Sequence, residues 1–274
     1  MKKILGAIAA LAMTVGLAAC GTPVSQGTAN QNQLVVGMEA GYPPFNWTQK
    51  DDSNGAVKIQ GTDQYAGGYD VEIAKRVAKQ LGKELVIVKT EWDGLTPALV
   101  SGKIDAIIAG MSPTEERKAT IDFTDSYYDS QLVLVVKKGS KYANATSLAD
   151  FAGAKVTAQL NTFHYSVIDQ ITGVDKQAAM DNFPAMRVAL QAGTIDAYVS
   201  ELPEAISAQA ANSDFVMVKL TDGFKASPED TQTAVGVKKD SPLTKEINEA
   251  LKTISSEERQ QIMQEAIKNQ PAAE

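Results

Sequence analysis

Short apolar runs and longer stretches with helical spacing alternate along the first half of the chain. Apolar residues recur every three or four positions in 69–81, which predicts an amphipathic helix that ends at Gly82. A shorter helix is expected at 95–100, before Ser101 and Gly102. Runs rich in Val, Leu and Ile are typical of buried strands, and they occupy residues 34–38, 84–88, 104–109 and 132–136. Strands that alternate with helices predict a mainly parallel sheet flanked by helices.

A second set of elements begins at residue 155. Strands are expected at 155–158 and 195–199, with a helix at 186–192. The segments 101–106 and 192–197 both place Ile-Asp-Ala after a glycine turn, a similarity that supports two related halves. Two sets of strands and helices predict an α/β fold with two lobes. Residues 49–67 are expected to form an exposed hairpin-like excursion. C-terminal helices are expected from Ser241-Pro242 onward and at 256–268.

The first twenty residues have the pattern of an export signal. Two lysines precede an apolar stretch at 4–19, which is shorter than the roughly 20 residues needed to span a bilayer. We expect a signal peptide at 1–19 that is cleaved just before Cys20, the single cysteine of the chain. The segment resembles the lipobox of bacterial lipoproteins, which implies that Cys20 is lipid-modified and anchors the protein to the cell membrane. An ordinary signal peptide with a chance cysteine is the alternative. Residues 20–32 then form a lipidated, flexible tether.

Composition and charge exclude some classes of binding partner. Without the two lysines of the leader, the formal charge falls from −7 to −9. Such a surface is unsuited to nucleic acid or to an anionic membrane surface. No second cysteine exists for a disulfide, so an exported protein must be held together by its core. The length that remains allows one large domain or two ordinary ones.

Motifs of enzyme chemistry are missing from the sequence. No Gly-x-Ser-x-Gly elbow occurs, and the Gly-Lys pairs at 82–83 and 102–103 are not followed by Ser or Thr, as a phosphate-binding loop requires. The single histidine, His164, offers little for a metal cluster or a Ser-His-Asp site, and we interpret it as a packed or surface residue. We therefore expect a protein that is not an enzyme and holds no metal or cofactor.

The segment 110–117 (GMSPTEER) is the sharpest candidate for a binding site. It follows a buried strand, and we expect Ser112 to cap a helix with Pro113 in the first turn and Glu115 completing a capping box. Free N–H groups at a helix start favour an anion. Arg117 could then hold a carboxylate with two hydrogen bonds. A well-capped helix with a surface arginine is the alternative.

Five motifs in order give the chain a family resemblance. Residues 33–268 resemble the type II periplasmic binding proteins for amino acids, which include the histidine-, glutamine- and lysine/arginine/ornithine-binding proteins. The matching motifs are Glu39-x-x-Tyr42-Pro43-Pro44-Phe45, residues 68–74, residues 92–99, residues 111–117, and Ile121-Asp122-Phe123-Thr124 before Tyr127-Tyr128. The resemblance implies a monomeric, extracytoplasmic protein that captures a free L-amino acid and delivers it to the permease of an ABC importer, with its ATPase.

The resemblance also implies roles for residues at the ligand's amino-acid head. Arg117 would hold the α-carboxylate, and Thr162 would reach it from the second lobe. The family's Gln-Gly-Thr motif is Gln159-Leu160-Asn161-Thr162 here, without its glycine. Glu201 would bind the α-ammonium in place of the family's aspartate, with a surface glutamate as the alternative. The turn and helix start before Arg117 would complete the carboxylate site through Gly110, Ser112 and Thr114.

The side-chain pocket decides which amino acid binds. Tyr42 and Trp92 stand where the family stacks flat groups around the ligand's side chain, and aromatic faces attract cations. Glu39 stands where the family carries an acid that meets the ligand's far end, although a solvated glutamate at a strand end is the alternative. Phe45 is expected to support this wall. An acid between aromatic walls favours lysine or arginine, with glutamine next; histidine also stays open.

The resemblance implies a hinged clamp. Lobe 1 is expected at 33–129 plus 235–270 and lobe 2 at 130–234, with hinge crossings near 128–131 and 231–236. A ligand that bridges the lobes would favour closure. Two rival functions share features with this one: a cyclohexadienyl dehydratase-like enzyme on the same fold, and the ectodomain of a sensor or adhesin.

Overall fold

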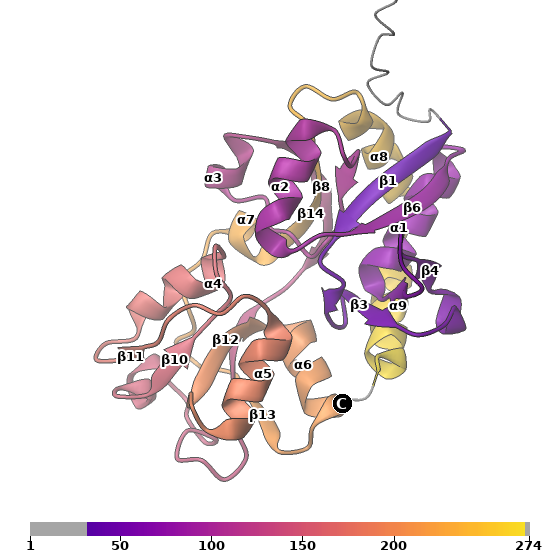
Figure 1. The fold of residues 1–274 in the computed structure, drawn as a ribbon. Coiled ribbons are helices and arrows are strands. Elements are labelled where there is room, and N and C mark those ends of the chain that lie inside the picture. Colours follow the sequence, from indigo (N-terminus) through magenta and orange to yellow (C-terminus); the bar gives the residue numbers. More distant parts are fainter. Residues whose placement is uncertain (1–31, 272–274) are drawn as a thin grey trace, which may run out of the picture. The chain divides into compact units, whose positions relative to one another are not determined.

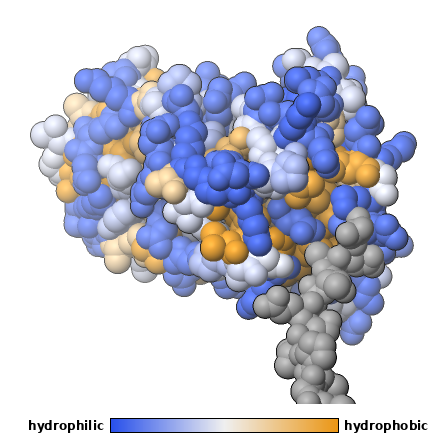
Figure 2. Space-filling model, turned by 90° about the horizontal axis from the view of Figure 1, so that it is seen from above, coloured by the Kyte–Doolittle hydropathy of each residue, from blue (hydrophilic) through white to orange (hydrophobic). Residues whose placement is uncertain are grey.

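The computed structural model describes residues 32–271 (Figure 1). The expected signal peptide, Cys20 and most of the tether lie outside the described residues. Within residues 32–271, none of the helices is long and apolar enough to cross a membrane. Hydrophilic side chains cover most of the face in Figure 2, and hydrophobic ones show through in separate patches.

The first lobe is built on a five-stranded sheet with the strand order β6-β1-β7-β14-β8. Its strands are β1 (Gln33–Met38), β6 (Glu84–Lys89), β7 (Ala106–Ile107), β8 (Asp122–Asp129) and β14 (Gln232–Val237). Its helices are α1 (Tyr69–Gln80), α2 (Trp92–Ser101), α3 (Glu115–Lys118), α8 (Leu243–Lys252) and α9 (Ser256–Asn269). The expected helices at 69–81 and 95–100 are therefore confirmed, and the second begins earlier, at Trp92.

The second lobe repeats this plan with the strand order β11-β10-β12-β9-β13. Its strands are β9 (Leu132–Lys137), β10 (Lys155–Thr157), β11 (Asp175–Lys176), β12 (Ala197–Glu201) and β13 (Phe215–Val218). Its helices are α4 (Phe163–Ser166), α5 (Phe183–Ala192) and α6 (Leu202–Ala211). The expected helix at 186–192 starts earlier because the Asn182 side chain caps α5 and Pro184 fits its first turn.

The two-lobe α/β fold is confirmed, but both sheets are mixed rather than mainly parallel. In the first lobe, β1 pairs parallel with β6 and β7, while β14 pairs antiparallel with β7 and β8. In the second lobe, β10 pairs parallel with β11 and β12, while β9 pairs antiparallel with β12 and β13. The antiparallel strands β9, β13, β8 and β14 adjoin the crossings between the lobes.

The interruption at 49–67 forms part of a small antiparallel sheet, in agreement with the expected excursion. This sheet has the strand order β2-β3-β5-β4, with bounds Gly41–Tyr42 (β2), Asn46–Gln49 (β3), Val57–Lys58 (β4) and Tyr65–Gly67 (β5). It carries Tyr42 next to the end of β1. The sheet therefore places an aromatic ring beside the carboxyl edge of the first-lobe strands.

Two chain crossings connect the lobes. One runs from β8 to β9, and the other runs from β13 through α7 (Pro228–Thr231) to β14. The backbone N–H of Ser130 donates to the carbonyl of Thr231 at 3.0 Å, which ties the two crossings together. β14 enters the first-lobe sheet at Gln232, ahead of the expected boundary at 235.

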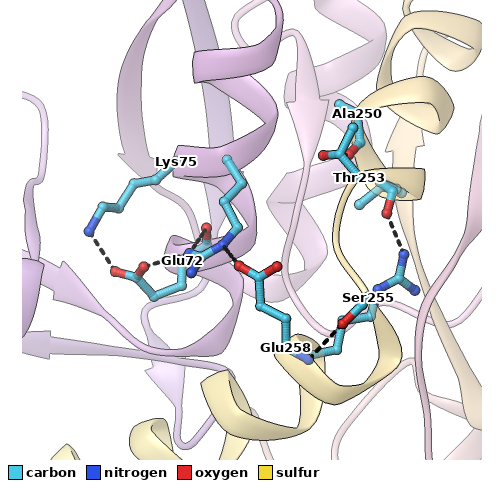
Figure 3. A network of polar contacts seen from close by, with 9 residues as sticks. Glu72, Lys75, Ala250, Thr253, Ser255 and Glu258 are labelled. Atoms are coloured by element: carbon cyan, nitrogen blue, oxygen red, sulfur yellow. Dashed lines mark hydrogen bonds and ion pairs between the residues drawn. The ribbon is translucent and has the colours of Figure 1, made fainter.

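The C-terminal helix α9 is tied to both lobes. Arg76 on α1 donates Nε to Glu258 at 2.9 Å and Nη1 to Glu72 at 2.8 Å, and Lys75 pairs with the same Glu72 (Figure 3). At the other end of α9, the Gln270 side-chain amide donates to the carbonyl of Ser207 on α6 at 3.1 Å. Contacts of this kind between lobes hold the conformation described here.

Candidate ligand-binding site

A small cavity of about 20 Å³ lies between the lobes, with room for about one water molecule. Of the residues expected at the site, it is lined by Tyr42, Trp92, Gly110, Ser112, Arg117 and Thr162. Five further lining residues were not expected: Gln159, Phe163, His164, Phe183 and Asp230. Glu39, Thr114 and Glu201 are not among the lining residues. The structure thus brings most of the expected site together around one space.

Arg117 is partly buried and forms no ion pair with a carboxylate among the described residues. Its Nη1 donates to the Ser112 carbonyl at 2.9 Å, and its Nη2 donates to the Asn161 carbonyl of the second lobe at 3.2 Å. Its Cζ lies 5.1 Å from the centroid of the Trp92 ring. Burial lowers the pKa of Arg117 to about 10. A partly buried guanidinium held by neutral groups favours an anionic ligand beside it.

The helix start before Arg117 differs from the expected one. The N-cap of α3 is Thr114, whose hydroxyl accepts from the Arg117 N–H at 3.4 Å, so the expected Ser112 cap is wrong. The Ser112 hydroxyl instead donates to the Asp230 carbonyl at 3.0 Å. Residues 111–114 are non-helical, which places Pro113 before the helix rather than in its first turn. Because α3 is a single turn, its dipole adds little to anion binding.

In the second lobe, Asn161 stands in the motif that lacks the family's glycine, yet its backbone has a conformation typical of glycine. Asn161 has a φ of 55°, in the left-handed region that asparagine tolerates better than most residues. Its side chain donates to Asp93 at 2.9 Å, and its carbonyl accepts from the Trp92 indole N–H at 3.4 Å. The following Thr162 donates its hydroxyl to the Gln159 carbonyl at 2.7 Å. Asn161 therefore forms the turn and also links the lobes.

Glu39 lies after β1, where it contacts the other lobe through one side chain. The Gln159 amide donates to its two carboxylate oxygens at 3.2 and 3.4 Å. Glu39 is 5% exposed, and burial raises its pKa to about 7. It borders a wider crevice of about 480 Å³ between the lobes, next to Lys89 and Glu91. Gln159, which bonds to this carboxyl group, also lines the small cavity.

Glu201, at the end of β12, is a second buried acid. It is 6% exposed, and burial, with repulsion from Glu204, raises its pKa to about 8. Glu204 itself is fully buried, but it has a cationic partner because Arg187 lies 2.7 Å away. No such ion pair involves Glu201 within the described part of the chain.

The aromatic residues are arranged differently from the expected pair of walls. The Tyr42 ring stacks on Phe183 of the second lobe, with centroids 4.5 Å apart and planes inclined by 12°. Its opposite face stacks on Phe45, with centroids 4.9 Å apart. Phe45 is fully buried, which agrees with its expected supporting role. Trp92 faces the guanidinium of Arg117 instead.

Comparisons with known proteins place the chain in one family. Residues 34–269 match the model of the bacterial extracellular solute-binding proteins, family 3. The chain belongs to this family. It is 30% identical over 254 residues to the arginine-binding extracellular protein ArtP of Bacillus subtilis, covering 92% of each chain. It is 32% identical over 229 residues to a probable histidine-binding protein of Campylobacter jejuni, covering 81% of this chain and 83% of the relative.

A solved structure resembles the solute-binding protein over most of its length. The crystal structure of the amino acid ABC transporter substrate-binding protein AbpA from Streptococcus pneumoniae, bound to L-arginine, has a TM-score of 0.74 and 27% sequence identity. The match covers 87% of this chain and 95% of AbpA. The likeness extends over both lobes and is consistent with the family assignment.

Behind the cavity, the solute-binding protein positions Tyr42 through a buried polar network. Asp70 accepts from the Tyr127 hydroxyl at 2.7 Å and from the Asn46 amide at 2.8 Å, and burial raises its pKa to about 6. Tyr127 in turn accepts from the Gly110 N–H at 3.1 Å. Gly110 has a φ of 63°, and a Cβ there would lie 2.7 Å from the Tyr42 ring. Glycine is therefore required for the turn and for the close approach of the ring.

His164 and Phe183 were missed because their roles depend on the other lobe. His164 lines the cavity, and burial together with Arg117 lowers its pKa to about 4. Phe183 follows Asn182, the N-cap of α5, and is the first residue of that helix. The Asn-x-Pro sequence, which is typical of a helix start, was the signal that could have drawn attention to this position. No group of three or more His, Cys, Asp or Glu side chains within residues 32–271 is arranged to hold a metal ion.

Proposed function

We propose that this chain captures a cationic L-amino acid between its lobes and delivers it to an ABC importer. The observation that carries the proposal is a set of charged groups that form no ion pair within residues 32–271. They are the partly buried Arg117 and the buried Glu39 and Glu201. Arg117 calls for an anionic group, whereas Glu201 and Glu39 each call for a cationic one. A ligand with one carboxylate and two cationic groups matches this set, as arginine and lysine do.

The proposed contacts follow from the charges and from the sides of the cleft. Arg117, with Gly110, Ser112 and Thr114 around its turn, binds the α-carboxylate. Thr162 contacts the same carboxylate from the second lobe, and Glu201 binds the α-ammonium. Since Arg117 and Glu201 belong to different lobes, a ligand held by both favours the closed conformation.

The far end of the ligand meets Glu39 beside the Tyr42 ring, with Trp92 flanking Arg117. A cation there keeps the Glu39 carboxylate ionised and replaces the water lost on burial. Glutamine is the alternative ligand in the same class. The observation that favours it is the pKa of about 7 for Glu39, because a protonated acid can donate a hydrogen bond to an amide oxygen.

The decisive experiment is a thermal-shift screen of the mature protein against the twenty amino acids. A ligand at about 1,000 times its dissociation constant stabilises the folded state by roughly 4 kcal/mol. Arginine or lysine should raise the melting temperature, and the Arg117→Ala variant should lose this response. Arg76→Ala, which removes an arginine from a remote ion pair on α1, should retain it. An unchanged response in Arg117→Ala would refute the site.

Two further parts of the proposal concern location and chemistry. We propose that Cys20 carries the lipid that anchors the protein on the outer side of the cell membrane, close to the permease and its ATPase. Release of a Cys20→Ala variant into the medium, with loss of incorporated labelled palmitate, would support this anchoring.

The rival enzymatic function predicts turnover of prephenate or arogenate, and such turnover would overturn the proposal.

A further inference from the structure

One face of the Tyr42 ring is permanently covered by its own lobe. Phe45 stacks on that face and is itself fully buried. The Tyr69 and Tyr128 rings contact Phe45 edge-on, with centroids 6.1 and 5.7 Å away. Gly110 packs against the edge of the Tyr42 ring, where even a methyl group would collide. A flat ligand group can therefore reach Tyr42 only on its other face.

That other face is covered by Phe183, which belongs to the second lobe. The two rings are nearly parallel, with a centroid distance of 4.5 Å. Phe183 is held within its own lobe by His164 and Tyr198, whose rings contact it edge-on with centroids 6.2 Å away. It is fully buried at the first position of α5. Lobe opening therefore carries Phe183 away from Tyr42 while its contacts within the second lobe persist.

The two rings line the same cavity as Arg117. A cavity of about 20 Å³ has no room for an amino-acid side chain, so the lobes must open before a ligand can enter. A flat group between two rings needs a separation of about 7 Å, or about 3.5 Å for each contact. A modest opening of the lobes from the present 4.5 Å provides that space.

We propose that Phe183 is a specificity-determining residue, the second wall of an aromatic clamp that closes with Tyr42 on the flat end of the ligand's side chain. This inference rests on the proposed function and goes beyond it in placing the side chain between residues of different lobes. The planar guanidinium of arginine stacks on two aromatic faces at once, whereas the compact ammonium of lysine does not. The clamp therefore favours arginine over lysine.

The test is calorimetric titration of the wild type and three variants with L-arginine and with L-lysine. Phe183→Leu keeps an apolar side chain but removes the ring, and it should weaken arginine binding by about threefold to tenfold and lysine binding less. Phe183→Tyr restores an aromatic face and should recover arginine affinity. The matched control is Phe151→Leu, which removes a ring stacked on Tyr142 in the core of the same lobe and should leave both affinities unchanged.

Each outcome decides between the clamp and its alternatives. Unchanged arginine affinity in Phe183→Leu would overturn the clamp, and so would an equal loss for arginine and lysine, which would indicate a merely structural role. Tighter arginine binding in Phe183→Leu would show that Phe183 obstructs the pocket, which also overturns it. If the wild type binds neither amino acid, the proposed function itself fails, and this result is distinct from a clamp that fails in a protein that binds arginine.

Discussion

Replacing Glu39 with glutamine should change how the stability of the ligand-free protein depends on pH. Burial raises the pKa of the Glu39 carboxyl from its ordinary 4.5 to about 7. Well below pH 4.5 the carboxyl group is protonated in both the folded and the unfolded state, so it does not change the free energy of unfolding. As the pH rises, the unfolded carboxyl ionises first, so the free energy of unfolding decreases until the folded group also ionises near pH 7.

The size of this effect follows from the two pKa values. The loss of unfolding free energy is about 0.8 kcal/mol at pH 5 and about 3.3 kcal/mol at pH 8. Glutamine keeps the shape and a polar group for Gln159 but cannot ionise. The Glu39→Gln variant should therefore gain about 2.5 kcal/mol relative to the wild type between pH 5 and pH 8. This value is an upper bound, because lobe opening rehydrates the carboxylate.

Urea unfolding at both pH values measures the effect directly. The matched control is Glu265→Gln, which alters an exposed glutamate on α9 and should leave the pH dependence of stability unchanged. The difference between Glu39→Gln and the wild type must grow from pH 5 to pH 8. An identical difference at both pH values would refute the reasoning. By the same linkage, L-arginine should bind the wild type more tightly at pH 8 than at pH 5, because its cation stabilises the ionised form of Glu39.

Three further substitutions test the structure around the cavity. Gly110→Ala should destabilise the fold by roughly 1–2 kcal/mol, since it forces a side chain into the left-handed region and against Tyr42; urea unfolding measures it. Glu204→Gln should cost about 3 kcal/mol because it leaves Arg187, whose side chain is 15% exposed, without its ion pair, and a double-mutant cycle with Arg187→Met should recover most of the loss. Asn161→Gly should retain ligand binding, whereas Asn161→Val should lose about 1–2 kcal/mol of stability, as read from melting curves and titrations.

Local pattern predicted the elements well because periodicity and helix ends are encoded by neighbouring residues. The helix at 69–81 is α1, and the excursion at 49–67 belongs to the small sheet. The mixed sheets were not predicted, since strand direction depends on where the chain crosses between lobes. The Ser112 cap failed for a similar reason. Its hydroxyl bonds to the distant Asp230, a contact that no local rule contains.

The family, the two sets of strands and helices, and the charged side chains available to a ligand can all be read from the order of the residues. Arg117, Glu39 and Glu201 could be named from their motifs. The surroundings of these three side chains depend on how the lobes pack together. Packing across the cleft brings Gln159 to Glu39 and Phe183 to Tyr42, each over more than a hundred residues of chain. The same packing removes water from the two acids and raises their pKa values, because desolvation depends on the complete shape of the cleft and not on any local stretch of sequence.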